Sequence, residues 1–306
     1  MNHAQFLQNL QVPQGKIDVI LDTDTYNEID DQFALSYLLR SKEKLHPVAV
    51  YAAPFYNENS TGPADGMEKS YEEILKILDL AGEAALKPFV FRGSDRYLPD
   101  EKTPVESAAA RDLCTRAMQY SPEKPLYVVA IGAITNLASA LLLRPEIKEN
   151  LVIVWLGGHA RHWMDTKEFN MHQDYAAARV VMGSGVPFVQ LPCEGVVSAF
   201  TVSGAELERF LMGKNPLADY LAKNTIAAAE KYAAGKPWTR VIWDVTAVAW
   251  LQNDGDRFMR TRLVPVSLPA YDGHYTEMPD APLMTYVYGI RRDALMHDLF
   301  QKLLSE

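Results

Sequence analysis

The chain has 306 residues, of which 48% are hydrophobic and 23% are charged, proportions typical of a globular protein that can bury a sizeable core. The net charge of -9 argues against a surface that binds nucleic acid. No apolar run approaches the roughly 20 residues of a membrane span. The two cysteines, Cys114 and Cys193, are too few for a disulfide framework and are expected to be reduced thiols within the core.

The first residues, MNHAQFLQNLQVPQGK, lack the apolar core of a signal peptide, so a cytoplasmic location is expected. No low-complexity linker and no internal repeat divides the sequence. One domain covering residues 1–306 is therefore expected, with neither a membrane nor a nucleic acid as a partner.

Short apolar runs alternate with longer helical patterns over the first two thirds of the chain. The apolar runs are rich in Val and Ile, as strands covered on both faces should be, and they span residues 17–22, 47–53, 88–92, 126–131, 151–156 and 187–191. Apolar residues recur at helical spacing in the segments 33–38, 70–82, 105–120, 136–147 and 175–185. This alternation predicts an α/β fold with an open, mostly parallel, Rossmann-like sheet and helices on both faces.

The pattern changes from about residue 203 onward. Helices are predicted over residues 203–213, 216–235 and 241–252, a short hairpin from the segments 262–270 and 282–289, and a closing helix over 291–304. The C-terminal part is therefore predicted to be largely helical.

The stretch ILDTDTYNEIDDQFAL, residues 20–35, places five carboxylates at the end of the first predicted strand and in the turn that follows. They are Asp22, Asp24, Glu28, Asp30 and Asp31. Like charges this close raise one another's pKa. Capping by Asn27 together with the helix dipole would explain the acids that begin the helix, but not Asp22 and Asp24 beside them.

A bound hard cation would relieve this repulsion, because carboxylate and carbonyl oxygens suit Ca²⁺ or Mg²⁺. The stretch contains no Cys or His, which argues against zinc. An EF-hand loop beginning at Asp22 fails, since Tyr26 and Phe33 occupy ligand positions. VILDTDT also resembles the opening of the haloacid dehalogenase-type phosphatases, although the late acidic segment VIWDVTAVA does not have the form of their metal motif.

Polar segments follow several of the predicted strands: YNEN (56–59), GAITN (132–136) and GGHARHW (157–163). In open α/β sheets, ligands bind beyond the carboxyl ends of the strands. The acidic stretch and these three segments are therefore expected to surround one site.

Four motifs, in chain order, resemble those of the inosine-uridine-type nucleoside hydrolases. VILDTD…IDDQFAL is similar to their opening DxDxGxDDxxA, and AIGAITNLASAL to their GxxTNxA segment. WLGGH followed by KEFNMHQDYAAARVV resembles GG…EFNxxxDPEAA, and WDVTAVA resembles HDPxAVA. The match covers roughly residues 17–250. It implies hydrolysis of the N-glycosidic bond of a ribonucleoside, a role in purine or pyrimidine salvage, one bound Ca²⁺ rather than Mg²⁺, and a homodimer or homotetramer.

The resemblance also implies roles for individual residues. The metal ligands would be Asp24, Asp31, Asp244 and the backbone carbonyl of Ile131. Asp24 would also take a proton from the metal-bound water. Asp30 would bind the ribose 2′-hydroxyl, Glu168 and Asn170 the other sugar hydroxyls, and Asn57 is a further candidate that no clean motif fixes. Asp22 would support the ligands from behind, and Asn136 is expected to cap its helix or to support the metal loop.

The chemistry suits these residue types independently of the resemblance. Breaking a C–N glycosidic bond develops oxocarbenium character on the sugar. Surrounding oxygen atoms stabilise that positive charge, and a carboxylate base is useful because Ca²⁺ acidifies water only weakly.

Two departures from the family pattern affect the site. TYNEI carries two extra residues, which are expected to swing Asn27 and Glu28 toward the rim. Trp243 stands where many relatives have a histidine that protonates the base, and an indole cannot act as an acid. Either another residue serves, with His159, His162, His172 and His274 as candidates, or Trp243 or Trp163 stacks on the base. The sequence leaves the preferred base open, including a leaving group other than a standard nucleobase.

Two classes of function remain at this point. The first is the Ca²⁺-dependent hydrolase, and the second is a catalytically idle relative that binds a ribosyl ligand. The presence of Asp24, Asp31 and Asp244 together favours the enzyme, because a binding protein does not need a base to activate water.

Overall fold

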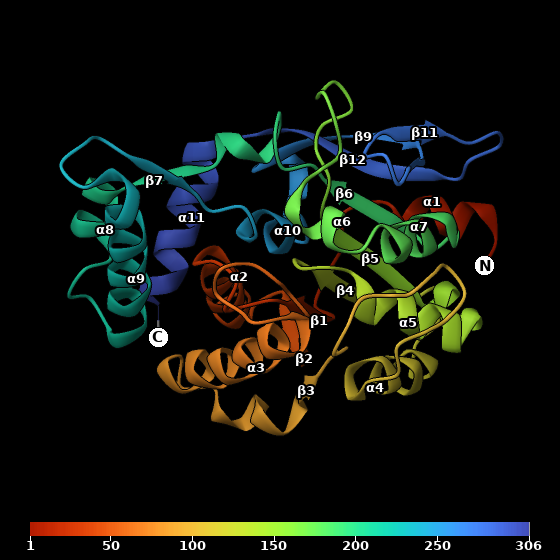
Figure 1. Cartoon of the computed structure of the whole chain (residues 1–306), viewed down its shortest axis with the longest axis horizontal. Helices are drawn as coiled ribbons and strands as arrows, with labels where there is room; N and C mark the ends of the chain where they lie inside the picture. Colours follow the sequence, from red (N-terminus) through yellow and green to blue (C-terminus); the bar gives the residue numbers. More distant parts are fainter. Residues whose placement is uncertain (306) are drawn as a thin grey trace.

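A computed structural model of the chain describes residues 1–305 and shows an eight-stranded sheet with helices on both faces (Figure 1). The strand order is β3-β2-β1-β4-β5-β6-β12-β9, and every neighbouring pair is parallel except β12 and β9. The strands are β1 (Ile17–Thr23), β2 (Leu45–Ala52), β3 (Val90–Arg92), β4 (Leu126–Ala130), β5 (Leu151–Leu156), β6 (Phe188–Leu191), β9 (Met259–Pro265) and β12 (Leu283–Ile290). The predicted fold class, an open and mostly parallel sheet, is confirmed.

Side chains alternate between two cores because successive residues of a strand point to opposite faces. In β1, Val19 and Leu21 pack into the first core and Ile20 into the second. The first core is covered by α2 (Asp30–Leu39), α3 (Pro63–Leu80), α9 (Pro216–Ala233), α10 (Val245–Trp250) and α11 (Arg292–Leu304). The second is covered by α4 (Ala108–Arg116), α5 (Thr135–Leu143) and α7 (Tyr175–Gly183). The prediction of helices on both faces is therefore confirmed as well.

The remaining elements are short. They are α1 (His3–Asn9), α6 (Phe169–Gln173), α8 (Gly204–Phe210), β7 (Thr201–Ser203), β8 (Thr239–Val241), β10 (Ser267–Pro269) and β11 (Tyr275–Glu277), with 3-10 turns at η1 (Ala84–Phe89), η2 (Ala117–Gln119), η3 (Pro145–Asn150), η4 (Val197–Ala199) and η5 (Asp254–Asp256). None of the helices within residues 1–305 combines the length and the apolar content that crossing a bilayer requires.

The predicted C-terminal hairpin forms, with its first strand at Met259–Pro265 instead of 262–270. β9 and β12 pair antiparallel, and β12 also pairs in parallel with β6, so that both strands extend the main sheet. The segment Met284–Val287 is buried, as a strand between two neighbours should be. The predicted strand over residues 88–92 is shortened to its last three residues, because Pro88 and Phe89 belong to η1.

The order in which strands are added to the sheet reverses between β1 and β4. From β1 the chain moves outward through β2 and β3, and it then returns to place β4 on the other side of β1. Asp22 of β1 lies in register with Ala130 of β4, and the Ile131 backbone N–H donates to the Asp22 carbonyl at 2.9 Å. The loops after these two strands therefore begin side by side, which is the position where open α/β sheets bind their ligands.

Asn136 connects the strand ends at this position. Its amide nitrogen donates to Oδ1 of Asp22 at 2.8 Å and to the Ala52 carbonyl at 3.2 Å. Its side-chain oxygen accepts from the backbone N–H and the hydroxyl of Ser94, at 2.7 and 2.9 Å. Asn136 therefore supports the loops around the site, which was one of its two predicted roles.

The first turn of α3 packs directly on the loop after β2. A Cβ atom on Gly66 would lie 2.1 Å from the Phe55 carbonyl oxygen, whereas a Cβ on Gly62, four residues earlier, would meet nothing within 4 Å. We expect Gly66→Ala to lower the free energy of unfolding by about 1–3 kcal/mol, the usual cost of overpacking. Gly62→Ala, the matched control, should cost less than about 1 kcal/mol. Urea denaturation would measure both, and equal effects would contradict this packing.

Candidate active site

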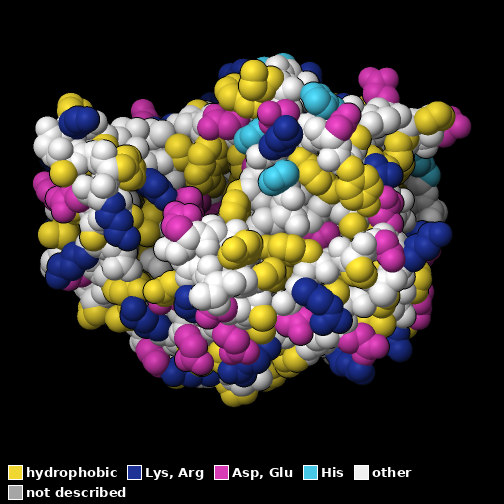
Figure 2. Space-filling model, viewed as in Figure 1, with side chains coloured by type: hydrophobic (Ala, Val, Ile, Leu, Met, Phe, Trp, Pro, Cys, Tyr) yellow, Lys and Arg dark blue, Asp and Glu magenta, His cyan; other side chains and the backbone are white. Residues whose placement is uncertain are grey.

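A cavity of about 240 Å³ lies beyond the carboxyl ends of the central strands. Five segments line it: the loop from β1 into α2, the end of β4, the loop from β5 into α6, the turn after β6, and the start of α10. In the view of Figure 2, histidine, acidic, basic and hydrophobic side chains gather around the loop that follows β5. The cavity thus brings together segments that are far apart in the sequence, as the strand-end argument predicts.

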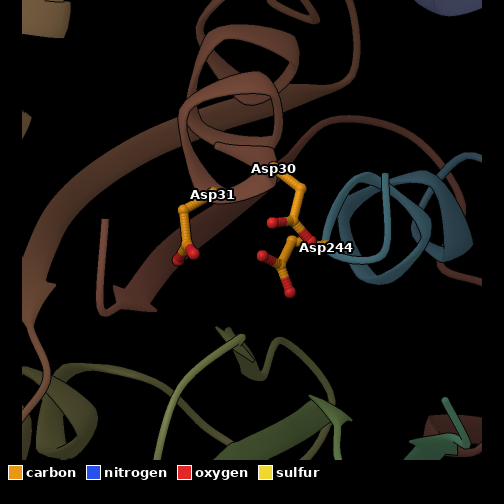
Figure 3. A group of neighbouring side chains, drawn as sticks. All are labelled: Asp30, Asp31 and Asp244. Carbon is orange, nitrogen blue, oxygen red and sulfur yellow. The ribbon is translucent and has the colours of Figure 1, made fainter. Parts of the chain in front are cut away.

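Three buried aspartates form the acidic wall of this cavity. Asp30 and Asp31 begin α2, and Asp244 immediately precedes α10, which packs against α2 (Figure 3). One carboxylate oxygen of each lies within 4.8 Å of the others, and none of the three residues is more than 4% exposed. The first acidic motif and the late Asp motif therefore meet in space.

Asp24 lies next to this group but outside the 4.8 Å cluster. Both of its carboxylate oxygens are buried, and no residue in the described part of the chain offers them a hydrogen bond. A Cβ atom on Gly132 would lie 3.1 Å from Oδ1 of Asp24, so the absence of a side chain there lets the end of β4 approach the carboxylate. Burial and the neighbouring Asp31 and Asp30 hold the pKa of Asp24 well above its usual range.

Hydroxyl and amide groups donate hydrogen bonds to Asp31 and Asp22. The Thr23 hydroxyl donates to Oδ1 of Asp31 at 2.5 Å and lies 2.8 Å from the Thr25 hydroxyl. Asp22 accepts from Asn136 on one oxygen, and its other oxygen is buried without a partner within residues 1–305. Burial raises the pKa of both Asp22 and Asp31 to about 7.

The acidic group receives little compensating positive charge from the protein. Arg240 of β8 lowers the pKa of Asp30, but its guanidinium is paired with Glu28 at 2.7 Å. Burial, Glu28 and Asp31 raise the pKa of Asp30 despite this arginine, and burial together with Asp30, Asp31 and Asp24 raises the pKa of Asp244. An oxygen-only donor set with unpartnered buried atoms fits a hard divalent cation, which would supply the missing charge.

The EFN segment connects the ends of β4 and β5 to the cavity. Glu168 accepts from the backbone N–H groups of Gly158, Asn170 and Met171 at 2.8, 2.8 and 2.9 Å. These bonds favour its ionised form, although burial raises the pKa of Glu168. The amide of Asn170 donates to the carbonyls of Ile131 and Leu156 at 3.2 and 3.1 Å. Glu168, Asn170 and Ile131 all line the cavity.

The two-residue insertion lies on the cavity wall, where Asn27 and Glu28 are both found. Asn57, a predicted sugar contact, is not among the residues that line the cavity. Its amide nitrogen instead donates to Oδ1 of Asn27 at 2.6 Å, and Asn59 donates to the Asn27 carbonyl at 2.9 Å. The loop after β2 therefore reaches the site through Asn27.

The structure separates the four candidate histidines. His159 lines the cavity, whereas His162, His172 and His274 are exposed and do not. Trp243 lines the cavity as well, while Trp163 is 42% exposed and its ring centroid lies 6.1 Å from that of His159.

Sequence reasoning missed the wall formed by Cys193 and Glu194, which follow β6 and line the cavity. Cys193 is buried, as expected of a reduced thiol. The position of the two residues, just after a predicted strand, was the available signal.

Comparison with known proteins gives consistent matches. The family model of the inosine-uridine preferring nucleoside hydrolases matches residues 19–278. The pyrimidine-specific ribonucleoside hydrolase RihA of Salmonella typhimurium is 29% identical over 260 residues, which cover 77% of this chain and 79% of that protein. A plant nucleoside hydrolase, PpNRh1, has a similar fold with a TM-score of 0.74 at 19% identity, covering 96% of this chain and 100% of that one. The purine-preferring ribonucleoside hydrolase from Gardnerella vaginalis gives a TM-score of 0.72 at 21% identity, covering 94% and 98%.

The buried acids predict how stability depends on pH when no divalent cation is present. Their pKa rises on folding, from about 4 in the unfolded chain to about 7 for Asp22 and Asp31. The folded state therefore binds more protons, so stability should fall as the pH rises through this window. Thermal unfolding in EDTA should show a decreasing melting temperature, by about 2–4 °C for each kcal/mol lost, and Ca²⁺ should restore it at neutral pH.

Two variants test the origin of this effect. Asp22→Asn, which removes one of the titrating groups, should reduce the pH dependence measured in EDTA. Asp18→Asn, at the opposite end of the same strand, should leave it unchanged. A melting temperature that rises with pH in EDTA would show that the protein itself already neutralises these acids.

Proposed function

The chain belongs to the inosine-uridine preferring nucleoside hydrolase family, and on that premise we propose that it hydrolyses a ribonucleoside with one Ca²⁺ and with Asp24 as the general base. Its reaction class is N-glycosyl hydrolysis, in which water cleaves the bond between ribose and base. The observation that best supports the proposal is the buried cluster of Asp30, Asp31 and Asp244, beside which Asp24 lies with both carboxylate oxygens buried and without a partner within residues 1–305. Membership of this family leaves the phosphatase alternative without support, and the presence of Asp24, Asp31 and Asp244 together favours the enzyme over an idle ligand-binding relative.

Asp24, Asp31, Asp244 and the carbonyl of Ile131 would hold the ion. All four offer oxygen atoms, and the Ile131 carbonyl keeps a second lone pair beyond the one that accepts from Asn170. Ca²⁺ suits this set better than Mg²⁺, which demands a stricter octahedron and retains more of its water. When bound, the ion would compensate the acidic charge and make nearby water more acidic.

Asp24 would accept a proton from the attacking water. Asp24 is not among the residues that line the cavity, but no donor within residues 1–305 engages its buried carboxylate oxygens, so they would be able to accept from a water molecule beside them. The close approach of Gly132 fixes the direction of the carboxylate. The water oxygen then bonds to C1′ as the C1′–N bond breaks.

The ribose would be held by acids and an amide. Asp30 would bind the 2′-hydroxyl, and Glu168 and Asn170 the other hydroxyls, so that C1′ faces the water. Asn57 would contribute by holding Asn27 on the cavity wall, in agreement with their 2.6 Å hydrogen bond. The surrounding oxygen atoms would stabilise the positive charge that develops on the sugar.

The relatives differ in the base that their names specify: one is called pyrimidine-specific and another purine-preferring. Trp243 lines the cavity and would provide an aromatic face for the base. Release of free base and ribose suits purine or pyrimidine salvage, and we expect a cytoplasmic homodimer or homotetramer without nucleic-acid or membrane partners.

The role of Asp24 can be tested by measuring ribose release from a panel of purine and pyrimidine nucleosides. Asp24→Asn should lower kcat by about 10²–10⁴-fold, the usual contribution of a positioned base. Asp18→Asn, at the start of the same strand and paired with His46 and Tyr120, serves as the control and should remain active. Full activity in Asp24→Asn would refute the assignment of the base.

Calorimetric titration of chelator-treated protein tests the ion. We expect one Ca²⁺ per chain, weaker binding of Mg²⁺, and loss of ribose release in EDTA that added Ca²⁺ restores. Asp244→Ala should abolish Ca²⁺ binding. The control Asp254→Ala changes an aspartate that pairs with Lys44 at 2.7 Å, away from the cavity, and should bind normally. Unchanged binding in Asp244→Ala would contradict the proposed ligand set.

A further inference from the structure

The wall of the cavity beyond the acids and the EFN segment is built from two adjacent loops. The loop after β5 and the turn after β6 are joined through the backbone. Cys193 N–H donates to the Gly158 carbonyl at 2.8 Å, and Ala160 N–H donates to the Glu194 carbonyl at 2.9 Å. His159 lies between these two contacts and lines the cavity. This wall is therefore available to contact the base of a ribonucleoside whose sugar is held by the acids and the EFN segment.

The imidazole of His159 has a defined hydrogen-bonding state. The backbone N–H of Glu194 donates to Nδ1 at 3.3 Å, so Nδ1 acts as the acceptor. In the neutral ring the proton is then on Nε2, since one nitrogen accepts and the other donates. Burial lowers the pKa of His159, which favours this neutral form. Within residues 1–305, no group forms a hydrogen bond with Nε2.

The position of His159 is fixed from several sides. The hydroxyl of Tyr275 donates to the His159 carbonyl at 3.2 Å, and Glu168 holds the preceding Gly158 N–H at 2.8 Å. Tyr275 is itself placed by Gln190, whose amide nitrogen lies 2.8 Å from its hydroxyl. A donor held this way needs little rearrangement when charge develops nearby.

The other donors on this wall are less suited to the departing base. The pKa of the Cys193 thiol is raised well above its usual range by burial and by Glu168, and a neutral thiol is a weak donor. Lys167 is exposed at the cavity mouth on a flexible side chain. His159 combines a place in the cavity, a free N–H and a fixed orientation.

We propose that His159 is a catalytic residue whose Nε2–H donates a hydrogen bond to the nitrogen base as it leaves, an inference that rests on the hydrolase function proposed above. When the C1′–N bond breaks, its electron pair stays on the base nitrogen. The oxygen of water bonds to C1′, and the proton of that water passes to Asp24. The neutral imidazole stabilises the negative charge on the base through the hydrogen bond and keeps its own proton, and the base is finally protonated by solvent.

Two substrates with different leaving groups separate this role from a purely structural one. A nucleoside releases a poor anionic leaving group, whereas 4-nitrophenyl β-D-ribofuranoside releases a stable phenolate that needs no donor. His159→Phe should lower kcat/KM for the preferred nucleoside by about 10²–10³-fold, as removal of one preorganised donor does. For the nitrophenyl riboside, kcat/KM should change by no more than roughly threefold.

Two further variants serve as matched comparisons. His159→Gln keeps an N–H near the position of Nε2 and should retain at least about tenfold more nucleoside activity than His159→Phe. His274→Gln makes the same change at an exposed histidine outside the cavity and should behave like wild type with both substrates. The Ca²⁺-dependent rise in melting temperature should be the same in all variants, which verifies that the acidic site is intact.

The outcomes are distinguishable. If His159→Phe hydrolyses nucleosides as fast as wild type, or loses both substrates to the same extent, the role assigned to His159 is wrong while the hydrolase function stands. If the wild-type protein cleaves neither any nucleoside nor the nitrophenyl riboside, the proposed function itself fails, and the inference fails with it.

Discussion

The central constraint on this structure is the mutual repulsion of aspartates that are buried at the edge of one sheet. Asp24, Asp30, Asp31 and Asp244 are each at most 4% exposed, and burial raises the pKa of all four. Neighbouring aspartates raise the pKa of Asp24, Asp30 and Asp244 further, and Arg240, which is already paired with Glu28, lowers the pKa of Asp30. Such a group is stable only when protons or a cation reduce its charge. The chemistry of the site and the stability of the fold therefore depend on the same atoms.

The parallel sheet is what makes this concentration of charge possible. Strands β1 and β4 end side by side at the point where the strand order reverses. The hydrogen bonds between these two strands fix the backbone up to Asp22 and Ile131. Asn136 donates a hydrogen bond to Asp22, and Gly132 leaves room for Asp24, but neither residue neutralises the charge of these acids. The polar groups proposed to bind the sugar come from the next strand end, through Glu168 and Asn170. The rigid part of the protein thus positions each group, while the loops supply the chemistry.

Much of the fold and of the position of the site could be predicted from the sequence, because parallel strands covered on both faces give continuous apolar runs with polar residues at their ends. The acidic stretch predicted a cation site from repulsion alone, and the structure adds that Asp30 joins Asp31 and Asp244 in the tightest group. Contacts between distant loops were not predictable. The bond from Asn57 to Asn27 and the fixed state of His159 depend on tertiary neighbours that periodicity does not reveal. The addition of β12 to the main sheet was missed for the same reason.

The packing of α10 against α2 has a consequence for how the protein matures. Asp30 and Asp31 are made early in synthesis, whereas Asp244 comes far later in the chain. A nascent chain can pair β1 with β2 and β4 long before Asp244 exists, so the proposed ion site would be completed only late in translation. Because an ion that binds only the finished arrangement stabilises it by mass action, metal uptake would act as a late checkpoint that distinguishes full-length chains from truncated ones.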